Sequence, residues 1–196
     1  HAGKQVAQLF ERIGLQAGEV GIHGVLIGER KRRHYTRGPL PVDDRGNPVH
    51  SHFGNAEETG MGHIIDFKRP DGSACRGYLA TAGQDRPGVV VIQEWWGLND
   101  QICGVADRFA GAGFNALAPD LFKGRVTRDA DEAGHLMNGL DFPGATHQDI
   151  RGAVDYLRGM GGGKVAAMGF CMGGALTIAA AVHVPNLAAG VCFYGI

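Results

Sequence analysis

Residues 165–182 read VAAMGFCMGGALTIAAAV. The stretch Val165–Gly169 predicts a buried strand, and the small and apolar run that begins at Ala175 predicts a helix. Between them, GFCMGG (169–174) has the strand–turn–helix context of a nucleophile elbow. Such a turn forces Cys171 into a strained backbone conformation, and its side chain then projects from the sheet edge. Glycines two residues before and two after are needed because strand and helix approach too closely there for a Cβ.

Two effects favour a reactive sulfur at Cys171. The N-terminus of the following helix carries a partial positive charge, which favours thiolate over thiol. The amide of Met172 is aimed at the place where an oxyanion would form. Two other interpretations compete with this one: a buried structural cysteine, and a phosphate-binding glycine loop. The second is weaker, because the turn is not G-x-G-x-x-G and no Lys-Ser/Thr pair follows it.

The chain around this turn alternates strand and helix patterns over residues 61–196. Strands are expected at 63–68, 74–80, 88–92, 115–118, 164–170 and 188–194, with a turn at 69–72 joining the first two. Helices are expected after a cap at Asp100, and at 129–140, 149–157 and 173–182. This order predicts an α/β fold with a doubly wound, mostly parallel sheet and helices on both faces.

The composition fits one domain with a packed core, since 44% of the 196 residues are hydrophobic and the formal net charge is -1. That charge argues against a nucleic-acid binder, and no apolar run is long enough for a membrane span. No secretory pattern opens the chain and the cysteines fit no zinc spacing, so we expect reduced thiols, no metal and a cytoplasmic location. Residues 1–60 form a polar N-terminal extension that we expect to be partly loop or disordered.

Several motifs resemble, in order, those of the dienelactone hydrolase family, which has an α/β-hydrolase fold. GFCMGGA (169–175) resembles the G-x-C-x-G-G elbow of that family, and VVIQEWWGLN (90–99) resembles the strand and loop that carry its essential glutamate. APDLF (118–122) resembles the end of the following strand, and VCFYG (191–195) resembles the strand after the elbow helix. The resemblance extends over residues 61–196 and predicts a partial hydrolase domain there.

The resemblance implies a carboxylic ester hydrolase, similar to carboxymethylenebutenolidase, that opens cyclic enol-lactones or related small esters. Carried over by position, Cys171 is the nucleophile and forms an acyl-thioester, while Glu94 accepts the thiol proton when substrate binds. The amides of Trp95 and Met172 supply the oxyanion hole. This chemistry needs no metal or organic cofactor. The expected partner is a small lactone or ester, not a nucleic acid or a membrane, and the oligomeric state stays open.

The chain departs from the family at its end. The acid and the histidine of the family's triad lie beyond the strand that residues 191–195 resemble, and this chain ends at Ile196. His183 follows Cys171 on the same helix by roughly 18 Å, at about 1.5 Å per residue, and we do not expect it to be the base. We therefore expect part of a longer hydrolase, which as it stands turns over no activated ester and ends on an exposed sheet edge.

One further set of residues and one alternative class remain. Arg125 and Arg128 lie in a segment that can line the pocket mouth, where the family uses arginines to hold a substrate carboxylate, but a surface role fits them better. The alternative from another class is a non-catalytic α/β-hydrolase-fold binding or regulatory module. The missing histidine favours that alternative, whereas the elbow and Glu94 favour the enzyme.

Overall fold

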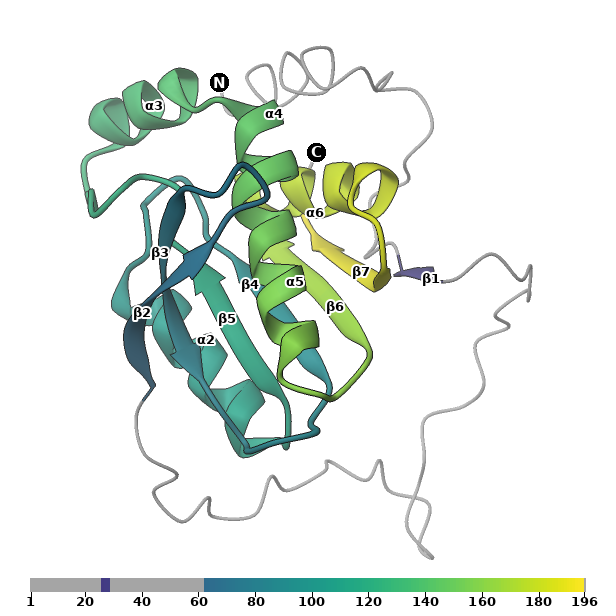
Figure 1. Ribbon diagram of the computed structural model, residues 1–196. Helices are drawn as coiled ribbons and strands as arrows, with labels where there is room; N and C mark the ends of the chain where they lie inside the picture. Colours follow the sequence, from purple (N-terminus) through teal and green to yellow (C-terminus); the bar gives the residue numbers. More distant parts are fainter. Residues whose placement is uncertain (1–25, 29–61, 196) are drawn as a thin grey trace, which may run out of the picture.

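A seven-stranded mixed sheet, in the order β1-β7-β6-β4-β5-β3-β2, forms the centre of the described structure (Figure 1). A computed structural model describes residues 62–195 and a short strand at 26–28, so the loop or disorder expected over most of residues 1–60 lies outside the described residues. The strands are β1 (Leu26–Gly28), β2 (His63–Lys68), β3 (Ala74–Ala80), β4 (Gly88–Ile92), β5 (Asn115–Pro119), β6 (Val165–Phe170) and β7 (Leu187–Phe193).

The four strands β7, β6, β4 and β5 run parallel at the centre of this sheet. The outer strands are antiparallel: β2 and β3 form the expected hairpin, β3 pairs with β5, and β1 pairs with β7. Parallel neighbours end at the same edge of a sheet, so the residues that follow β4, β6 and β7 come together. The sequence motifs of interest follow these three strands.

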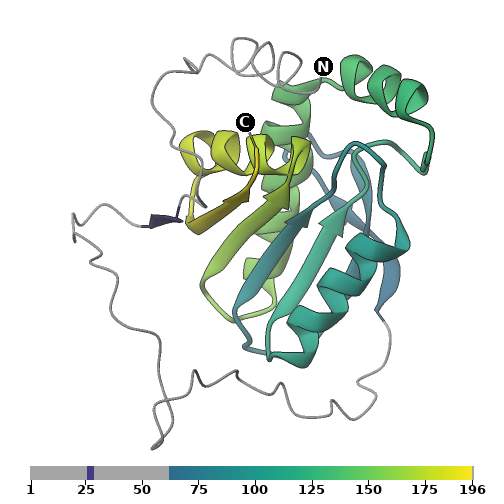
Figure 2. The ribbon, with the colours of Figure 1, turned by 180° about the vertical axis from the view of Figure 1, so that it is seen from behind.

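Helices cover both faces of the sheet, as the alternating pattern predicts (Figures 1 and 2). They are α2 (Asp100–Gly111), α3 (Ala130–Gly139), α4 (Phe142–Gly144), the π-helical turn η1 (Ala145–Ile150), α5 (Arg151–Gly159) and α6 (Met172–His183). In β4, Val90 and Ile92 pack into the core shared with α5 and α6, while Val89 and Val91 pack against α2. Successive side chains of a strand alternate between faces, so this uninterrupted apolar strand supplies both cores. The α/β fold class is confirmed.

Two helix starts differ from expectation. Asn99, not Asp100, caps α2: its backbone is extended and its side chain accepts a hydrogen bond from the Ile102 amide at 3.1 Å. The helix expected at 149–157 is the end of a longer helical segment that begins at Phe142 and runs through α4, η1 and α5. The wider π turn shifts the phase of the apolar positions, which hides this segment from a search for a 3.6-residue period.

The edge of the sheet beside β7 is not open over its whole length. Leu26–Gly28 pairs antiparallel with β7, opposite Ala189, Gly190 and Val191. The expectation of an exposed edge at this strand is therefore wrong over these three positions, because the N-terminal extension supplies a partner strand. Among the described helices, none has both the length and the hydrophobicity that a bilayer crossing requires.

Candidate active site

The turn between β6 and α6 has the strained geometry that its sequence predicts. Cys171 has φ 53° and ψ −121°, a conformation that side-chain-bearing residues rarely adopt, and it is the N-cap residue of α6. Its amide donates to the Phe193 carbonyl at 3.0 Å, and its own carbonyl accepts from the Ala175 amide at 3.1 Å. Backbone strain of this kind costs on the order of 1–3 kcal/mol and persists only where the surroundings hold it. Here the end of β7 and the first turn of α6 hold it.

The glycines around Cys171 are required by close backbone approach. A Cβ on Gly169 would overlap the backbone of Gly173, and a Cβ on Gly173 would overlap the carbonyl oxygen of Ile92 at the end of β4. A Cβ on Gly174 would lie 2.8 Å from the Phe193 carbonyl oxygen. The helix thus packs against the ends of three strands without an intervening side chain, as the elbow interpretation requires.

The Cys171 thiol is half-buried, and its environment favours the protonated form. Burial raises the pKa of the Cys171 thiol, and the charge of Glu94 raises it further. The Met172 amide hydrogen bonds to the sulfur and lowers the pKa, but this effect is smaller than that of burial. The donor at the helix start lowers the pKa of the thiol, as the sequence predicts, but desolvation of the sulfur outweighs it.

Glu94 lies two residues beyond the end of β4 and is half-buried. Its Oε1 accepts a hydrogen bond from the Tyr194 hydroxyl at 3.2 Å, although the two residues are 100 positions apart. Its charge acts on the thiol of Cys171 and on the hydroxyl of Tyr194, raising the pKa of each. The fold thus brings together two of the residues that the sequence pointed to, Glu94 and Cys171, with the Met172 amide at the sulfur.

The other expected oxyanion donor is the Trp95 amide. The Trp95 ring packs against the core on the α5–α6 face and meets the Trp96 ring edge-on, with ring centroids 5.0 Å apart. No contact of the Trp95 amide with the thiol or the carboxylate defines its role, so the oxyanion hole stays a prediction.

Tyr194 is the residue of this site that the sequence analysis missed. The sequence predicts Tyr194 as the last residue of a strand, but β7 ends at Phe193, and Tyr194 has φ 39°. The signal that points to it is topological: it follows a strand parallel to β4 and β6, so it reaches the same sheet edge as Glu94 and Cys171.

The described histidines do not reach the thiol. His183 is the last residue of α6, and its ring centroid lies 5.4 Å from that of His147 in η1. No histidine is among the described groups that shift the pKa of Cys171. Within the described residues, no three His, Cys, Asp or Glu side chains gather as a metal site.

Two surface hollows lie near this edge, and Cys171 lines neither. One, of about 610 Å³, is lined by Trp96 and Arg128, together with residues that precede and begin α2. The other, of about 380 Å³, lies between the β2–β3 turn and α3 and includes Arg125. Arg125 pairs with Glu132 at 3.0 Å on the surface. The two arginines therefore line different hollows.

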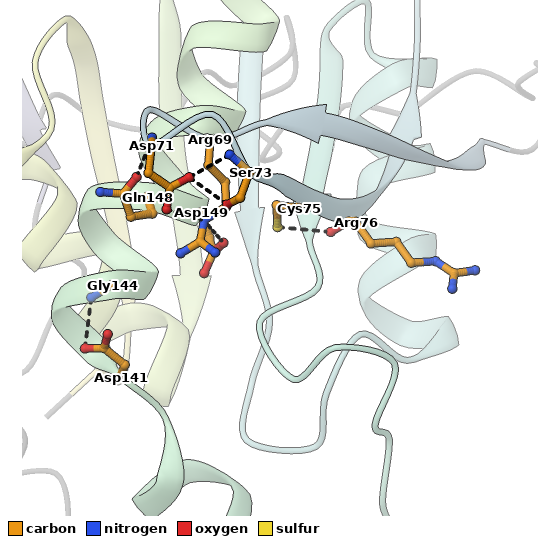
Figure 3. A network of polar contacts seen from close by, with 9 residues as sticks. All are labelled: Arg69, Asp71, Ser73, Cys75, Arg76, Asp141, Gly144, Gln148 and Asp149. Atoms are coloured by element: carbon orange, nitrogen blue, oxygen red, sulfur yellow. Dashed lines mark hydrogen bonds and ion pairs between the residues drawn. The ribbon is translucent and has the colours of Figure 1, made fainter.

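A second thiol lies beside a carboxylate, in the polar network of the β2–β3 turn and η1 (Figure 3). Cys75 is buried, and its sulfur donates to the Arg76 carbonyl at 3.4 Å. Asp149 Oδ1 lies 3.1 Å from Arg69 Nε, but that N–H is not directed at the oxygen well enough for a hydrogen bond. Burial strongly raises the pKa of the Cys75 thiol, and the Asp149 charge adds to it. Burial also raises the pKa of Asp149, since it outweighs the imperfectly aligned Arg69.

Comparison with known proteins gives one consistent result. The family model described as "Dienelactone hydrolase family" matches residues 75–196. Protein usf of Aquifex pyrophilus is 39% identical over 148 residues, which cover 69% of this chain and 62% of that protein. A provisionally named carboxymethylenebutenolidase of Aquifex aeolicus is 34% identical over 145 residues, which cover 69% of this chain and 62% of that protein. The solved structure "m3DLH" aligns with a TM-score of 0.53 at 32% identity, covering 65% of this chain and 57% of that one. The matched part of the chain thus spans less than two thirds of the length of these relatives.

Proposed function

Since the chain belongs to the dienelactone hydrolase family, we propose that its protein is a carboxylic ester hydrolase that opens a lactone or small ester through an acyl-thioester on Cys171. The observation that carries this proposal is the strained elbow: a half-buried sulfur at φ 53°, facing the Met172 amide, with the Glu94 carboxylate close enough to raise its pKa. The relatives named for carboxymethylenebutenolidase activity support the same class. No cofactor is needed, because the chain supplies the nucleophile and the proton acceptor.

The chemical step follows from these groups. The Cys171 proton passes to the Glu94 carboxylate, and the thiolate attacks the carbonyl carbon of the ester. The electron pair of the carbonyl moves to oxygen, where the Met172 amide, and by analogy the Trp95 amide, stabilise it. When the carbonyl re-forms, the carbon–oxygen bond of the ester breaks, the alkoxide or enolate takes the proton that Glu94 received, and the acyl group stays on sulfur. Restoring the thiol requires a second step, in which a base-activated water cleaves the thioester.

Without substrate, the surroundings of Cys171 favour the protonated thiol, which is a poor nucleophile. Burial of the sulfur is the main cause of the raised pKa of Cys171, and the charge of Glu94 adds to it, so both disfavour the thiolate. Transfer of the thiol proton to Glu94 removes the repulsion, because the carboxyl group becomes neutral as the sulfur becomes charged. The site therefore forms the nucleophile only together with a neutral Glu94, which limits side reactions of a free thiolate.

A second candidate, a non-catalytic binding module, is favoured by the absence of any described histidine near the thiol. Attack by water on a thioester needs a general base, and the described residues supply none besides Glu94. We therefore expect acylation of Cys171 to be faster than hydrolysis of the thioester, so that the acyl group accumulates on the sulfur. A binding module would not be acylated at Cys171 at all.

The two candidates separate in one experiment with p-nitrophenyl acetate. The expected result is a burst of one equivalent of p-nitrophenolate followed by slower release, with one acetyl group found on the Cys171 peptide by mass spectrometry. Cys171→Ala should abolish this burst, and Cys75→Ala, which removes another buried thiol, should preserve it. Acetylation spread over other residues, or none, supports the binding module. Steady turnover without a burst contradicts the expected accumulation of the acyl group.

A further inference from the structure

The position of Tyr194 is imposed by the elbow. Its φ of 39° lies in the left-handed region, which a tyrosine adopts only under constraint. The preceding carbonyl, that of Phe193, accepts the Cys171 amide at 3.0 Å. The Phe170 ring stacks on Phe193 with centroids 4.9 Å apart and contacts the Tyr194 ring at 6.0 Å. Backbone and ring contacts from the nucleophile turn thus direct the chain that carries Tyr194.

The Tyr194 hydroxyl is hydrogen-bonded to Glu94, the proposed proton acceptor of the site. It donates to Glu94 Oε1 at 3.2 Å, across 100 residues of sequence. The pKa of Tyr194 is raised by burial first, then by Glu94 and by the charged form of Cys171, although 65% of the residue is exposed. Tyr194, Glu94 and Cys171 therefore form one electrostatically coupled group at the sheet edge.

We propose that Tyr194 is a positioning residue, whose hydroxyl holds the Glu94 carboxylate beside the Cys171 thiol. This inference rests on the proposed function, because it assigns a partner to the proposed proton acceptor. A carboxylate without this donor is solvated best in water and moves away from the half-buried sulfur.

The same hydrogen bond explains how the restraint is released. A donor binds a carboxylate more strongly than it binds a neutral carboxyl group. When Glu94 takes the thiol proton, its hydrogen bond with the Tyr194 hydroxyl therefore weakens, and the protonated side chain is free to leave the new thiolate. Tyr194 therefore restrains the Glu94 side chain while it is a carboxylate, and restrains it less once it is protonated.

The test is the pH dependence of Cys171 alkylation by iodoacetamide, followed by mass spectrometry of its peptide from pH 6 to 10. The titratable described groups that act on this thiol are Glu94 and Tyr194. Tyr194→Phe should lower the midpoint of the profile and speed alkylation at pH 8 roughly two- to fivefold, the range expected for a partly exposed charge interaction. Glu94→Gln should act in the same direction. The double variant should be no faster than Glu94→Gln alone, because the hydroxyl acts only through the carboxylate.

Tyr78→Phe is the matched control, since the Tyr78 hydroxyl also donates to a carboxylate, that of Asp107 at 3.0 Å, away from the thiol. It should leave the profile unchanged. Tyr194→Phe removes only a hydroxyl from an exposed side chain, so its unfolding midpoint in urea should match that of the parent. An unchanged profile in Tyr194→Phe, or additive effects in the double variant, overturns the inference. The proposed function fails separately, by absence of an acyl group on Cys171.

Discussion

Cys171 and Cys75 are both thiols beside a carboxylate, and the molecule surrounds them differently. Cys171 is half-buried at a strained turn, with the Met172 amide at its sulfur and Glu94 held by a tyrosine hydroxyl. Cys75 is buried in a regular strand, and its carboxylate neighbour, Asp149, is paired with Arg69 (Figure 3). In both cases burial raises the pKa of the thiol, most strongly for Cys75.

The difference shows what a thiol and a carboxylate need before they can do chemistry. Glu94 has no cationic partner among the described ion pairs, so it can accept a proton without breaking one. Asp149 would have to give up its pairing with Arg69, and the sulfur next to it is out of reach of solvent. At Cys171 the strained backbone holds a half-buried sulfur at the start of α6, whereas at Cys75 regular strand packing buries the sulfur.

The largest expected effect tests whether backbone geometry holds the Cys171 site. In Gly173→Ala the new Cβ would overlap the Ile92 carbonyl, so strand β4 and helix α6 must move apart. We expect a loss of about 3 kcal/mol in the free energy of unfolding, the upper range for a forced core rearrangement, measured by urea denaturation. Acylation at Cys171 should fall with it.

Gly134→Ala in α3 is the matched control, because a Cβ there meets no atom within 4 Å. It should change the free energy of unfolding by no more than about 1 kcal/mol, in the stabilising direction that Ala has over Gly in a helix. If both variants behave alike, the close approach of strand and helix is not what fixes the turn.

The next effect compares the two thiols directly. At pH 8 iodoacetamide should alkylate Cys171 about a hundredfold faster than Cys75, since each unit of pKa changes the thiolate fraction about tenfold and burial also blocks access. Peptide mass spectrometry of a time course measures both sites in one sample. In 8 M urea the two rates should converge, because the unfolded chain gives both thiols the same surroundings. Equal rates in the native protein would place Cys171 in the same class as a structural cysteine.

Much of this comparison could be predicted from the sequence. The spacing of glycines around Cys171 predicts the strained turn, because only glycine permits the backbone approach seen at Gly169 and Gly173. The apolar run at 88–92 predicts a buried strand, which the structure shows packed on both faces, and the motif after it leads to Glu94. These features are local, so short stretches of sequence carry them.

The rest depends on contacts between distant segments. Tyr194 meets Glu94 only because β7 and β4 end at the same edge, and no short pattern records that contact. The direction of the Cys171 pKa depends on how deeply the turn is covered, which a helix N-terminus alone does not reveal. The π turn at 145–150 likewise breaks the 3.6-residue periodicity by which a helix is recognised.

The smallest effect concerns the carboxylate beside Cys75. Burial raises the pKa of Asp149 above its ordinary value of 3.8, so the folded state binds that proton more tightly than the unfolded chain does. Its favourable contribution is fully present below pH 3.8 and is lost as the pH rises through the raised folded pKa. Relative to Asp149→Asn, the free energy of unfolding of the parent should therefore decrease between pH 4 and 7. At pH 7 the two should differ by no more than about 1 kcal/mol, because Arg69 offsets part of the cost of burying the charged carboxylate.

Asp71→Asn tests a second carboxylate of the same polar network, whose contribution to stability should change with pH in the opposite direction. Hydrogen bonds from Ser73 lower the pKa of Asp71, so its contribution is present above pH 3.8 and is lost as the pH falls through the lowered folded pKa. Urea unfolding at several pH values gives the free energy of unfolding of the parent minus that of each variant. Plotted against pH, this difference should fall for Asp149→Asn and rise for Asp71→Asn. If the difference for Asp149 also rises with pH, then the attraction of Arg69 outweighs burial. Asp149 would then be an anion held by its ion pair, and Glu94 and Asp149 would differ less in charge state than in freedom to move.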